Sequence, residues 1–387
     1  ADGTTYCGRV GHRLSLWPLQ FIVEAFFLYL LKMINIKQSY NVLGVMSGTS
    51  LDGIDICFAT FTKKNRKWNF LIICCETIKY DQYWINNLTN AHKLSGPSIK
   101  KLNYKFTTYM ASVILEFIKK YKLNNIDFIS SHGHTILHKP SQNLTFQIGN
   151  ISELNKLTNI VVVCDFRTQD IKYGGQGAPL VPIGDLLLFD SYRYCINLGG
   201  FSNISIKENS KIIAYDICAV NVVLNHYSRI AGLEFDMDGE LSKSGKINTD
   251  LLSKLNSISF YNKKNPKSLA IEWVEDKIFP VIDRSNASVQ DILRTYIEHI
   301  SIIISKNIED SNANILFTGG GVKNKFLLST LSKKLNKKIE LESEEVIDFK
   351  EALIFGFLGV LKIRNENNCL KSVTGAKDDH SSGIIFK

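Results

Sequence analysis

The sequence predicts an α/β protein made of two similar domains that face one central cleft. From Asn41 onward, strand-like and helix-like segments alternate along the chain. A strand that opens into a Gly/Ser/Thr turn and returns as a strand occurs twice, at residues 44–55 and 197–206. With 387 residues, the chain has room for two domains of ordinary size. We expect the first domain at 41–190 and the second at 191–387.

The first half of the chain is expected to begin with an antiparallel group of strands. Three apolar, β-branched segments separated by turn residues predict these strands at 42–45, 54–61 and 70–78. A helix is predicted over 98–121, where apolar residues recur at helical spacing after Ser98, a suitable N-cap. The remaining predicted elements are strands at 127–130, 144–148 and 159–163 and a helical segment at 179–192.

The second half repeats the order of strands followed by helices. The predicted strands are 194–198, 203–206, 211–214 and, later, 314–318. The predicted helices are 218–231, 246–256, 289–309, 322–335 and 348–363. No short-period repeat is present, so a solenoid or propeller is excluded.

The composition is that of a chain with an ordinary hydrophobic core. It is 45% hydrophobic and 21% charged, which excludes a disordered or collagen-like protein. The formal net charge of +9 is dispersed in short runs without interleaved aromatic residues, so we expect no nucleic-acid binding. Eight cysteines form no CxxC pair and lie mostly in apolar runs. This indicates reduced, buried thiols in a cytoplasmic protein, and neither disulfides nor a zinc site.

Residues 1–40 are treated as a leader or read-through segment outside the core fold. The most apolar stretch of the chain is 15–31, but it contains Pro18 and Glu24, which are costly inside a membrane. No signal-peptide cleavage site follows it. We therefore expect Met33 to be the natural start, with a helix packed on the body and a membrane anchor as the alternatives.

Three glycine-containing turns are candidates for binding phosphate. In the first, backbone N–H groups and hydroxyls could hold phosphate oxygens, and an acid beside them could hold Mg²⁺. The alternative is a hairpin without a ligand. The residues of this turn are Gly48, Thr49, Ser50, Asp52 and Gly53.

The second and third turns strengthen this prediction, because three phosphate-type turns in one chain are more specific than one. The second contains Gly199 and Gly200, and the third follows an apolar strand and permits close approach of a nucleotide. No GxxxxGK[ST] string is present, which excludes a P-loop enzyme. Asp216 is a second candidate for the Mg²⁺ and phosphate network. The third turn consists of Gly319, Gly320 and Gly321.

A substrate floor is predicted between the two halves, where polar residues follow the apolar strand 160–163. An acid at a strand end, Asp165 or Asp170, could act as a general base, whereas an ion pair of Arg167 with an acid is the alternative. The glycine-rich loop that follows adds Gly175, Gln176 and Gly177. His132, His134 and His138 could bind a metal, but their setting favours hydrogen bonding to substrate or within the structure.

These strings together closely resemble anhydro-N-acetylmuramic acid kinase, a bacterial sugar kinase of the actin/hexokinase/Hsp70 superfamily. The resemblance implies two duplicated actin-like (RNase H-like) domains. Two departures stand out: His134 replaces the usual Gln, and DICAVN at 216–221 replaces DTGPGN. The matching strings, in order, are GVMSGTSLDGID (44–55), SHGHTILHKP (131–140), FQIGN (146–150), DFRTQDIKYGGQGAPLVP (165–182), NLGGFSN (197–203), FDMDGELSKSG (235–245), PKSL (266–269), TGGGVKN (318–324), EAL (351–353) and VTGA (373–376).

The resemblance implies ATP-dependent opening of 1,6-anhydro-N-acetylmuramic acid by water, with phosphorylation of O6, in peptidoglycan recycling. It implies ATP and Mg²⁺ as cofactors and a homodimer. Asp170 would be the base that activates water, with Asp165 the alternative. His132 and Arg167 would contact the sugar. The phosphate and nucleotide contacts would come from the three turns together with Asp216 and Asn221, and the metal ligands would be Asp52 and Asp216.

Two other functions remain open at this point. A related sugar kinase could act on an amino sugar with a free 6-hydroxyl, which needs no activated water. An ATP-binding switch or a degenerate homologue is the alternative outside catalysis. The retained acids and the intact GGQGAPLVP string argue against a switch, because a switch needs no sugar floor.

Overall fold

The structure is a computed structural model that describes residues 37–208, 211–310 and 312–387. The chain divides into two units, 1–38 and 39–387, and every element described below belongs to the second. Most of the predicted leader segment 1–40, including the apolar stretch 15–31 and Met33 as the start, lies outside the described residues. Its predicted end is wrong, because Ser39 and Tyr40 already belong to the first strand of the core (Ser39–Ser47), where Tyr40 is buried. No helix in the described part of the chain is long and apolar enough to cross a membrane.

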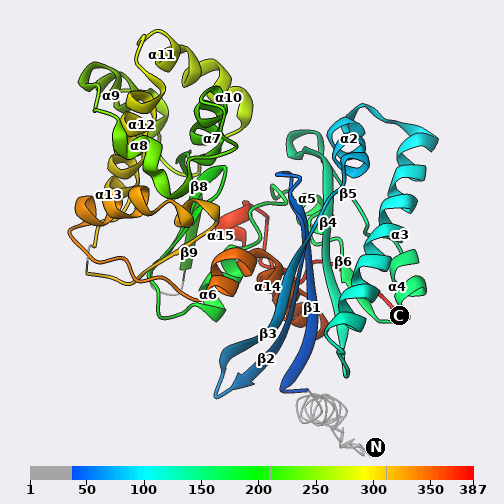
Figure 1. The fold of residues 1–387 in the computed structure, drawn as a ribbon. Coiled ribbons are helices and arrows are strands. Elements are labelled where there is room, and N and C mark those ends of the chain that lie inside the picture. The colour runs from blue at the N-terminus through cyan, green and yellow to red at the C-terminus, as the bar shows by residue number, and fades with distance from the viewer. Residues whose placement is uncertain (1–36, 209–210, 311) are drawn as a thin grey trace, which may run out of the picture. The chain divides into compact units, whose positions relative to one another are not determined.

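The strands form two mixed sheets (Figure 1). The first runs in the order β11-β6-β4-β1-β2-β3, with β5 added on β4, and the second in the order β10-β7-β8-β9. The strands of the first sheet are β1 (Ser39–Ser47), β2 (Gly53–Lys64), β3 (Lys67–Lys79), β4 (Phe128–Lys139), β5 (Leu144–Ile148), β6 (Val162–Cys164) and β11 (Ile384–Phe386). Those of the second are β7 (Tyr194–Leu198), β8 (Phe201–Glu208), β9 (Lys211–Ala219) and β10 (Ile315–Thr318).

Helices cover the sheets, which confirms the predicted class of two α/β domains around a cleft. In the first half they are α2 (Gln82–Asn90), α3 (Gly96–Lys120), α4 (Glu153–Thr158), α5 (Thr168–Lys172) and α6 (Pro182–Leu188). In the second half they are α7 (Asn221–Ile230), α8 (Glu240–Ser244), α9 (Thr249–Asn256), α10 (Ile271–Lys277), α11 (Phe279–Asp283), α12 (Val289–Lys306), α13 (Lys325–Leu335), α14 (Glu344–Ile363) and α15 (Lys371–Thr374).

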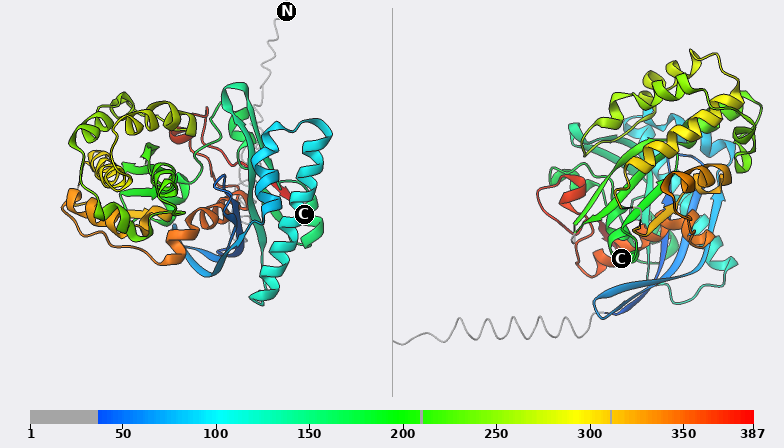
Figure 2. Two further views of the ribbon diagram at one scale, coloured as in Figure 1. Left: turned by 45° about the horizontal axis from the view of Figure 1, so that its top comes forward. Right: turned by 90° about the vertical axis from the view of Figure 1, so that its left-hand side faces the viewer.

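The centre of the first sheet is buried on both faces, and alternate side chains of a strand there point to opposite sides. In β1, Leu43 and Val45 pack in the cluster that contains α3, whereas Val42 packs in the cluster that contains α14. Figures 1 and 2 show α3 and α14 on the two faces of this sheet. Gly44 permits the close approach of α14, because a Cβ there would lie 2.0 Å from the carbonyl oxygen of Ala352.

The predicted antiparallel group is confirmed by the pairing of β1 with β2 and of β2 with β3. Two predicted boundaries are wrong around residue 218. The strand predicted to end at 214 continues to Ala219, and the helix predicted from 218 begins at Asn221. Burial explains the longer strand, since Ile217, Cys218 and Ala219 are fully buried.

The last strand of the chain returns to the first sheet. β11 pairs with β6 in antiparallel register, and α14 packs against β1, β2 and β4. β11 is not among the strands predicted from the sequence, and the domain boundary at residue 190 stays a prediction. The seven cysteines in the described residues are free thiols; five are buried, whereas Cys74 and Cys75 are only partly buried. The five buried ones are Cys57, Cys164, Cys195, Cys218 and Cys369.

Candidate active site

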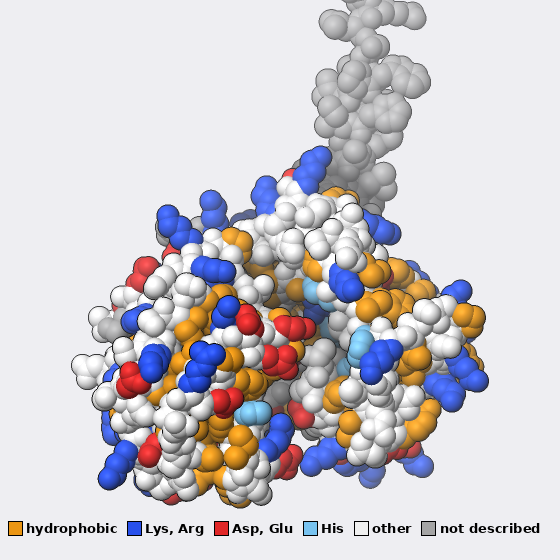
Figure 3. Space-filling model, turned by 90° about the horizontal axis from the view of Figure 1, so that it is seen from above, with side chains coloured by type: hydrophobic (Ala, Val, Ile, Leu, Met, Phe, Trp, Pro, Cys, Tyr) orange, Lys and Arg blue, Asp and Glu red, His pale blue; other side chains and the backbone are white. Residues whose placement is uncertain are grey.

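A cleft of about 2090 Å³ is lined by residues of both sheets. Figure 3 looks toward it and shows acidic side chains gathered at its mouth. The three predicted phosphate turns meet here. The residues of these turns that line the cleft are Gly48, Thr49, Ser50, Asp52, Gly199, Gly200, Gly319, Gly320 and Gly321. Residues as far apart in the sequence as Gly48 and Gly321 therefore share one cavity.

The first turn joins β1 to β2 and is fixed at its base by a buried hydrogen-bond network. The Ser47 hydroxyl contacts the Tyr80 hydroxyl at 2.6 Å and His134 Nδ1 at 2.8 Å. Burial lowers the pKa of His134 to about 4, so the ring is neutral at physiological pH. His134, which stands where the family usually has Gln, thus holds the end of β1 and does not line the cleft.

The second and third turns pack directly on each other, which explains two of the three consecutive glycines. A Cβ on Gly319 would lie 2.4 Å from Asn197 Oδ1, and one on Gly321 would lie 2.8 Å from Leu198. Gly320 has nothing closer than Asn221 Nδ2 at 3.9 Å. Gly320 is therefore the glycine that leaves the turn open to a ligand.

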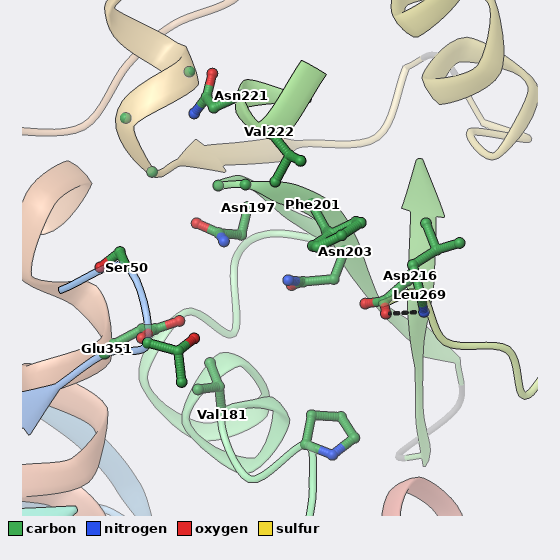
Figure 4. Close-up of a pocket in the computed structure, with 18 of the residues that line it drawn as sticks. Ser50, Val181, Asn197, Phe201, Asn203, Asp216, Asn221, Val222, Leu269 and Glu351 are labelled. Carbon is green, nitrogen blue, oxygen red and sulfur yellow. Dashed lines mark hydrogen bonds between the residues drawn. The ribbon is translucent and has the colours of Figure 1, made fainter. Parts of the chain in front are cut away.

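Asn221 ties the second turn to the start of α7. Its backbone N–H donates to Gly199 O, and its side chain donates to Leu198 O. Figure 4 shows Asn221 and Val222 above the turn, with Asn197 below. The altered 216–221 segment therefore keeps the contact that holds this turn. Its four replaced positions are buried apolar residues of β9 and the helix start.

His132 and Arg167 form a buried pair at the cleft. His132 Nδ1–H donates to Gly133 O, and His132 Nε2 accepts from Arg167 Nε–H at 2.9 Å. Arg167 Nη1 also donates to Gly177 O at 2.7 Å. Burial, and then the Arg167 charge, lowers the pKa of His132 well below its usual value, which keeps the acceptor nitrogen free of a proton. Both residues line the cleft, with Arg167 held from two sides.

The two predicted bases, Asp170 and Asp165, do not line the cleft. Asp170 is fully buried; one carboxylate oxygen accepts from Gly177 N–H at 2.7 Å and the other from the Thr374 hydroxyl at 2.8 Å. Asp165 accepts from the Thr168 hydroxyl at the start of α5. Both acids therefore support the floor from behind. Of the glycine-rich loop, Gln176 lines the cleft, whereas Gly175 and Gly177 do not.

Asp216 is the acid that reaches the cleft from the second sheet. It lies inside β9, opposite Asn203, at a bulge where the register of β8 and β9 shifts. Such a bulge redirects the side chains beside it. The Asp216 carboxylate accepts from Leu269 N–H at 2.8 Å (Figure 4). Burial raises its pKa above the usual value, and the Leu269 hydrogen bond opposes that shift.

A second group of carboxylates lies beside the first turn. Burial raises the pKa of Asp55 to about 6, the hydrogen bond from Thr77 opposes this, and the charges of Glu351, Asp52 and Asp348 raise it further. All four acids line the cleft. Figure 4 places Glu351 with Ser50, across the cleft from Asp216. Oxygen ligands of this kind are those that Mg²⁺ prefers.

Several residues of this site are not among the predicted site residues. Asp55 and Glu351 lie in the matching strings GVMSGTSLDGID and EAL, where nothing local distinguishes them from other carboxylates. Leu269 lies in the matching string PKSL. It contributes its backbone N–H, which every residue except proline has, so its residue type gives no sign of this role. The buried ion pair of Lys350 with Asp185, 2.9 Å apart, also lines the cleft and left no local signal.

Two α/β halves, with glycine turns and a carboxylate converging on one cleft, define an enzyme of the sugar kinase class. The family model for anhydro-N-acetylmuramic acid kinase matches residues 40–387, and the chain belongs to that family.

Similar proteins of the same name come from three bacteria. The protein from Mannheimia succiniciproducens is 32% identical over 90% of this chain and 99% of its own length. The protein from Haemophilus influenzae is 32% identical over 92% of this chain and 99% of its own length. The protein from Pseudomonas syringae pv. tomato is 32% identical over 90% of this chain and 100% of its own length. The prediction made from the sequence strings is thus confirmed at the level of the family.

Proposed function

We propose that the protein uses ATP and water to convert 1,6-anhydro-N-acetylmuramic acid to N-acetylmuramic acid 6-phosphate, with Asp216 as the base. The observation that carries this proposal is the Asp216 carboxylate, held by Leu269 N–H in the cleft where the three glycine turns meet. This assignment replaces Asp170, whose two oxygens are both bonded outside the cleft.

In this reaction, Asp216 takes a proton from water as the water oxygen bonds to C1 of the sugar. The C1–O6 bond breaks, and O6 is then free to attack the γ-phosphorus of ATP while ADP leaves. Before ring opening O6 is an ether oxygen, so the base and the phosphate turns must act in one cavity. The buried His132–Arg167 pair supplies a fixed positive charge, which suits the carboxylate of the muramic acid side chain.

The carboxylates beside the first turn fit Mg²⁺. Asp52 and Asp55, with Glu351 nearby, are the residues that would hold the ion. A bound Mg²⁺ would neutralise charge on the transferred phosphoryl group. Asp216, which lies on the far side of the cleft, serves here as the base and not as a metal ligand.

The test is mass spectrometry of the product formed from the anhydro sugar, ATP and Mg²⁺ in ¹⁸O-labelled water. We expect a 6-phosphate with label at the anomeric carbon. Unlabelled product incubated for the same time measures exchange at that carbon and is the control. Phosphorylation of free N-acetylmuramic acid with no turnover of the anhydro sugar would overturn the proposal and favour an ordinary hexose kinase.

The pH profile should report on Asp216. Because burial raises its pKa above the usual 3.8, kcat/KM is expected to fall tenfold per pH unit below a midpoint higher than 3.8. The measurement is kcat/KM for the anhydro sugar at saturating ATP across pH 3–8, with enzyme reassayed at pH 7.5 to exclude denaturation. An acid limb at or below pH 3.8 would contradict the assignment.

The response to Mg²⁺ should depend on Asp55. Its raised pKa means that the native state binds a proton more tightly than the unfolded state, so this group's contribution to stability is lost as the pH rises from about 4 through about 6. Above about pH 6, where Asp55 is charged, a bound Mg²⁺ should offset the repulsion between Asp55 and the neighbouring carboxylates. We expect Mg²⁺ to raise Tm more at pH 8 than at pH 5, and Asp55→Asn to reduce that difference. An equal shift at both pH values would contradict it.

A cytoplasmic location and a homodimer complete the proposal as implied by the family resemblance. Size-exclusion chromatography with light scattering tests the second directly.

A further inference from the structure

A second cluster of possible metal ligands lies behind the cleft floor. Asp170, Cys369 and His380 each offer one ligand atom, and these atoms all lie within 4.8 Å of one another. The three residues are 0%, 2% and 7% exposed. Cys369 and His380 are paired across an antiparallel bridge, with mutual backbone hydrogen bonds, and Asp170 comes from α5. This is the one such cluster in the described residues.

The His380 ring is oriented as a metal ligand would be. Its Nδ1 faces Asp378 O at 3.0 Å, so Nδ1 carries the hydrogen. Its Nε2 is buried, has no hydrogen-bond partner, and points to Asp170 Oδ1 at 3.6 Å. A histidine that donates through one nitrogen to a carbonyl and offers the other is the usual arrangement at zinc sites.

His380 Nε2 and the Asp170 carboxylate face each other without a hydrogen bond, an arrangement that a cation between the two lone pairs would stabilise. A proton on Nε2 would make a charge-assisted hydrogen bond of about 2.7–2.9 Å, shorter than the gap observed. Zinc bond lengths of about 2.1 Å give a tetrahedral edge of about 3.4 Å, close to that gap. The nearby Cys369 thiol makes only a long hydrogen bond, 4.0 Å, to Phe166 O.

We propose that Asp170, Cys369 and His380 bind one Zn²⁺ ion. On binding, the Cys369 thiol loses its proton to solvent, and His380 Nε2 supplies its lone pair to the ion. The thiolate and the carboxylate then balance the two positive charges, so the complete site is neutral and suited to burial. Cysteine, histidine and carboxylate together favour zinc over Mg²⁺.

The ion would fasten the C-terminal segment to the floor of the cleft. Asp170 also holds Gly177 N–H, Gln176 N–H donates to Thr374 O, and His380 stacks on Tyr173 with ring centroids 4.7 Å apart. The Zn²⁺ site would therefore position the glycine-rich loop that includes Gln176. It is a positioning site, separate from the phosphate turns.

The test is titration of the metal-free full-length protein with Co²⁺, which replaces zinc and gives a thiolate-to-cobalt absorption band in the near ultraviolet. We expect one Co²⁺ per chain, and zinc should displace it. Cys369→Ser should abolish the band, and His380→Asn should weaken binding by more than the roughly 10–100-fold that loss of a group supporting a ligand costs. Circular dichroism checks that both variants fold.

Cys195→Ser is the matched control, since Cys195 is equally buried but lies in β7 of the second sheet. It should keep the band. Absence of a stoichiometric band in the wild type, or a band that survives Cys369→Ser, overturns the proposal and leaves a protonated His380 beside Asp170. Because the readout is absorbance, its failure is independent of any failure of the kinase assay.

Discussion

Replacing Asp216 with Asn is expected to lower kcat by about 10²–10⁴-fold, the usual contribution of a general base. Asn keeps the size of the side chain and can still accept the hydrogen bond from Leu269 N–H, so the site should stay intact. The amide cannot take a proton from water, and the C1–O6 bond should no longer open. Binding of ATP should be unchanged. The measurements are single-turnover kinetics with the anhydro sugar and calorimetric titration with a nonhydrolysable ATP analogue.

Two variants make this result specific. Asp238→Asn changes another acid of the cleft lining, one that pairs with Lys325, and should leave kcat within a few-fold of the wild type. Asp170→Asn should mainly lower stability, because it weakens the contacts with Gly177 and Thr374. If Asp170→Asn lost turnover with unchanged Tm while Asp216→Asn remained active, the base would be Asp170 after all.

Replacing Lys350 with Met is expected to lower the free energy of unfolding by about 3–5 kcal/mol, the usual effect of breaking a buried ion pair. Lys350 and Asp185 are 5% and 2% exposed, and they join α14 to α6. Asp185 Oδ1 makes the ion pair without a well-aligned hydrogen bond, so removal of Lys350 leaves a buried, unpaired charge. Urea denaturation of the two proteins at pH 7.5 measures the loss.

The double variant Lys350→Met, Asp185→Leu separates the cost of the unpaired charge from that of lost packing. It should recover most of the stability, because an apolar pair of similar volume often replaces a buried ion pair without loss. Lys254→Met breaks an exposed pair with Asp250 and should change stability by about 0.5 kcal/mol or less. A double variant as unstable as the single one would show that packing, and not charge, dominates here.

Much of the fold could be predicted from local patterns. The strands at 144–148 and 194–198 match β5 and β7 to the residue, because short apolar segments between turn residues have little freedom in their length. The helices predicted at 98–121 and 289–309 lie within a few residues of α3 and α12. Boundaries failed where burial overrode propensity, as in the extension of β9 to Ala219.

The site could be predicted in part. Glycine turns can be recognised in the sequence, because only glycine tolerates the close approach of Gly319 to Asn197 or of Gly321 to Leu198. The role of a carboxylate cannot be recognised in this way, since the same residue type serves as a base, a metal ligand or a loop anchor according to its surroundings. Asp170 and Asp216 are alike in the sequence, and only the cleft distinguishes the buried anchor from the accessible acid.

The sequence by itself determined the α/β class, the three turns and, through its matched strings, the family. These features are encoded locally, in periodicity and in short motifs, and need no knowledge of distant contacts. The tertiary structure decided which acid faces the cleft, how His132 orients Arg167, and why the C-terminal segment meets Asp170. Each of these depends on residues brought together across 35 to 204 positions of the chain. Such contacts are set by the packing of whole elements, which no local pattern specifies.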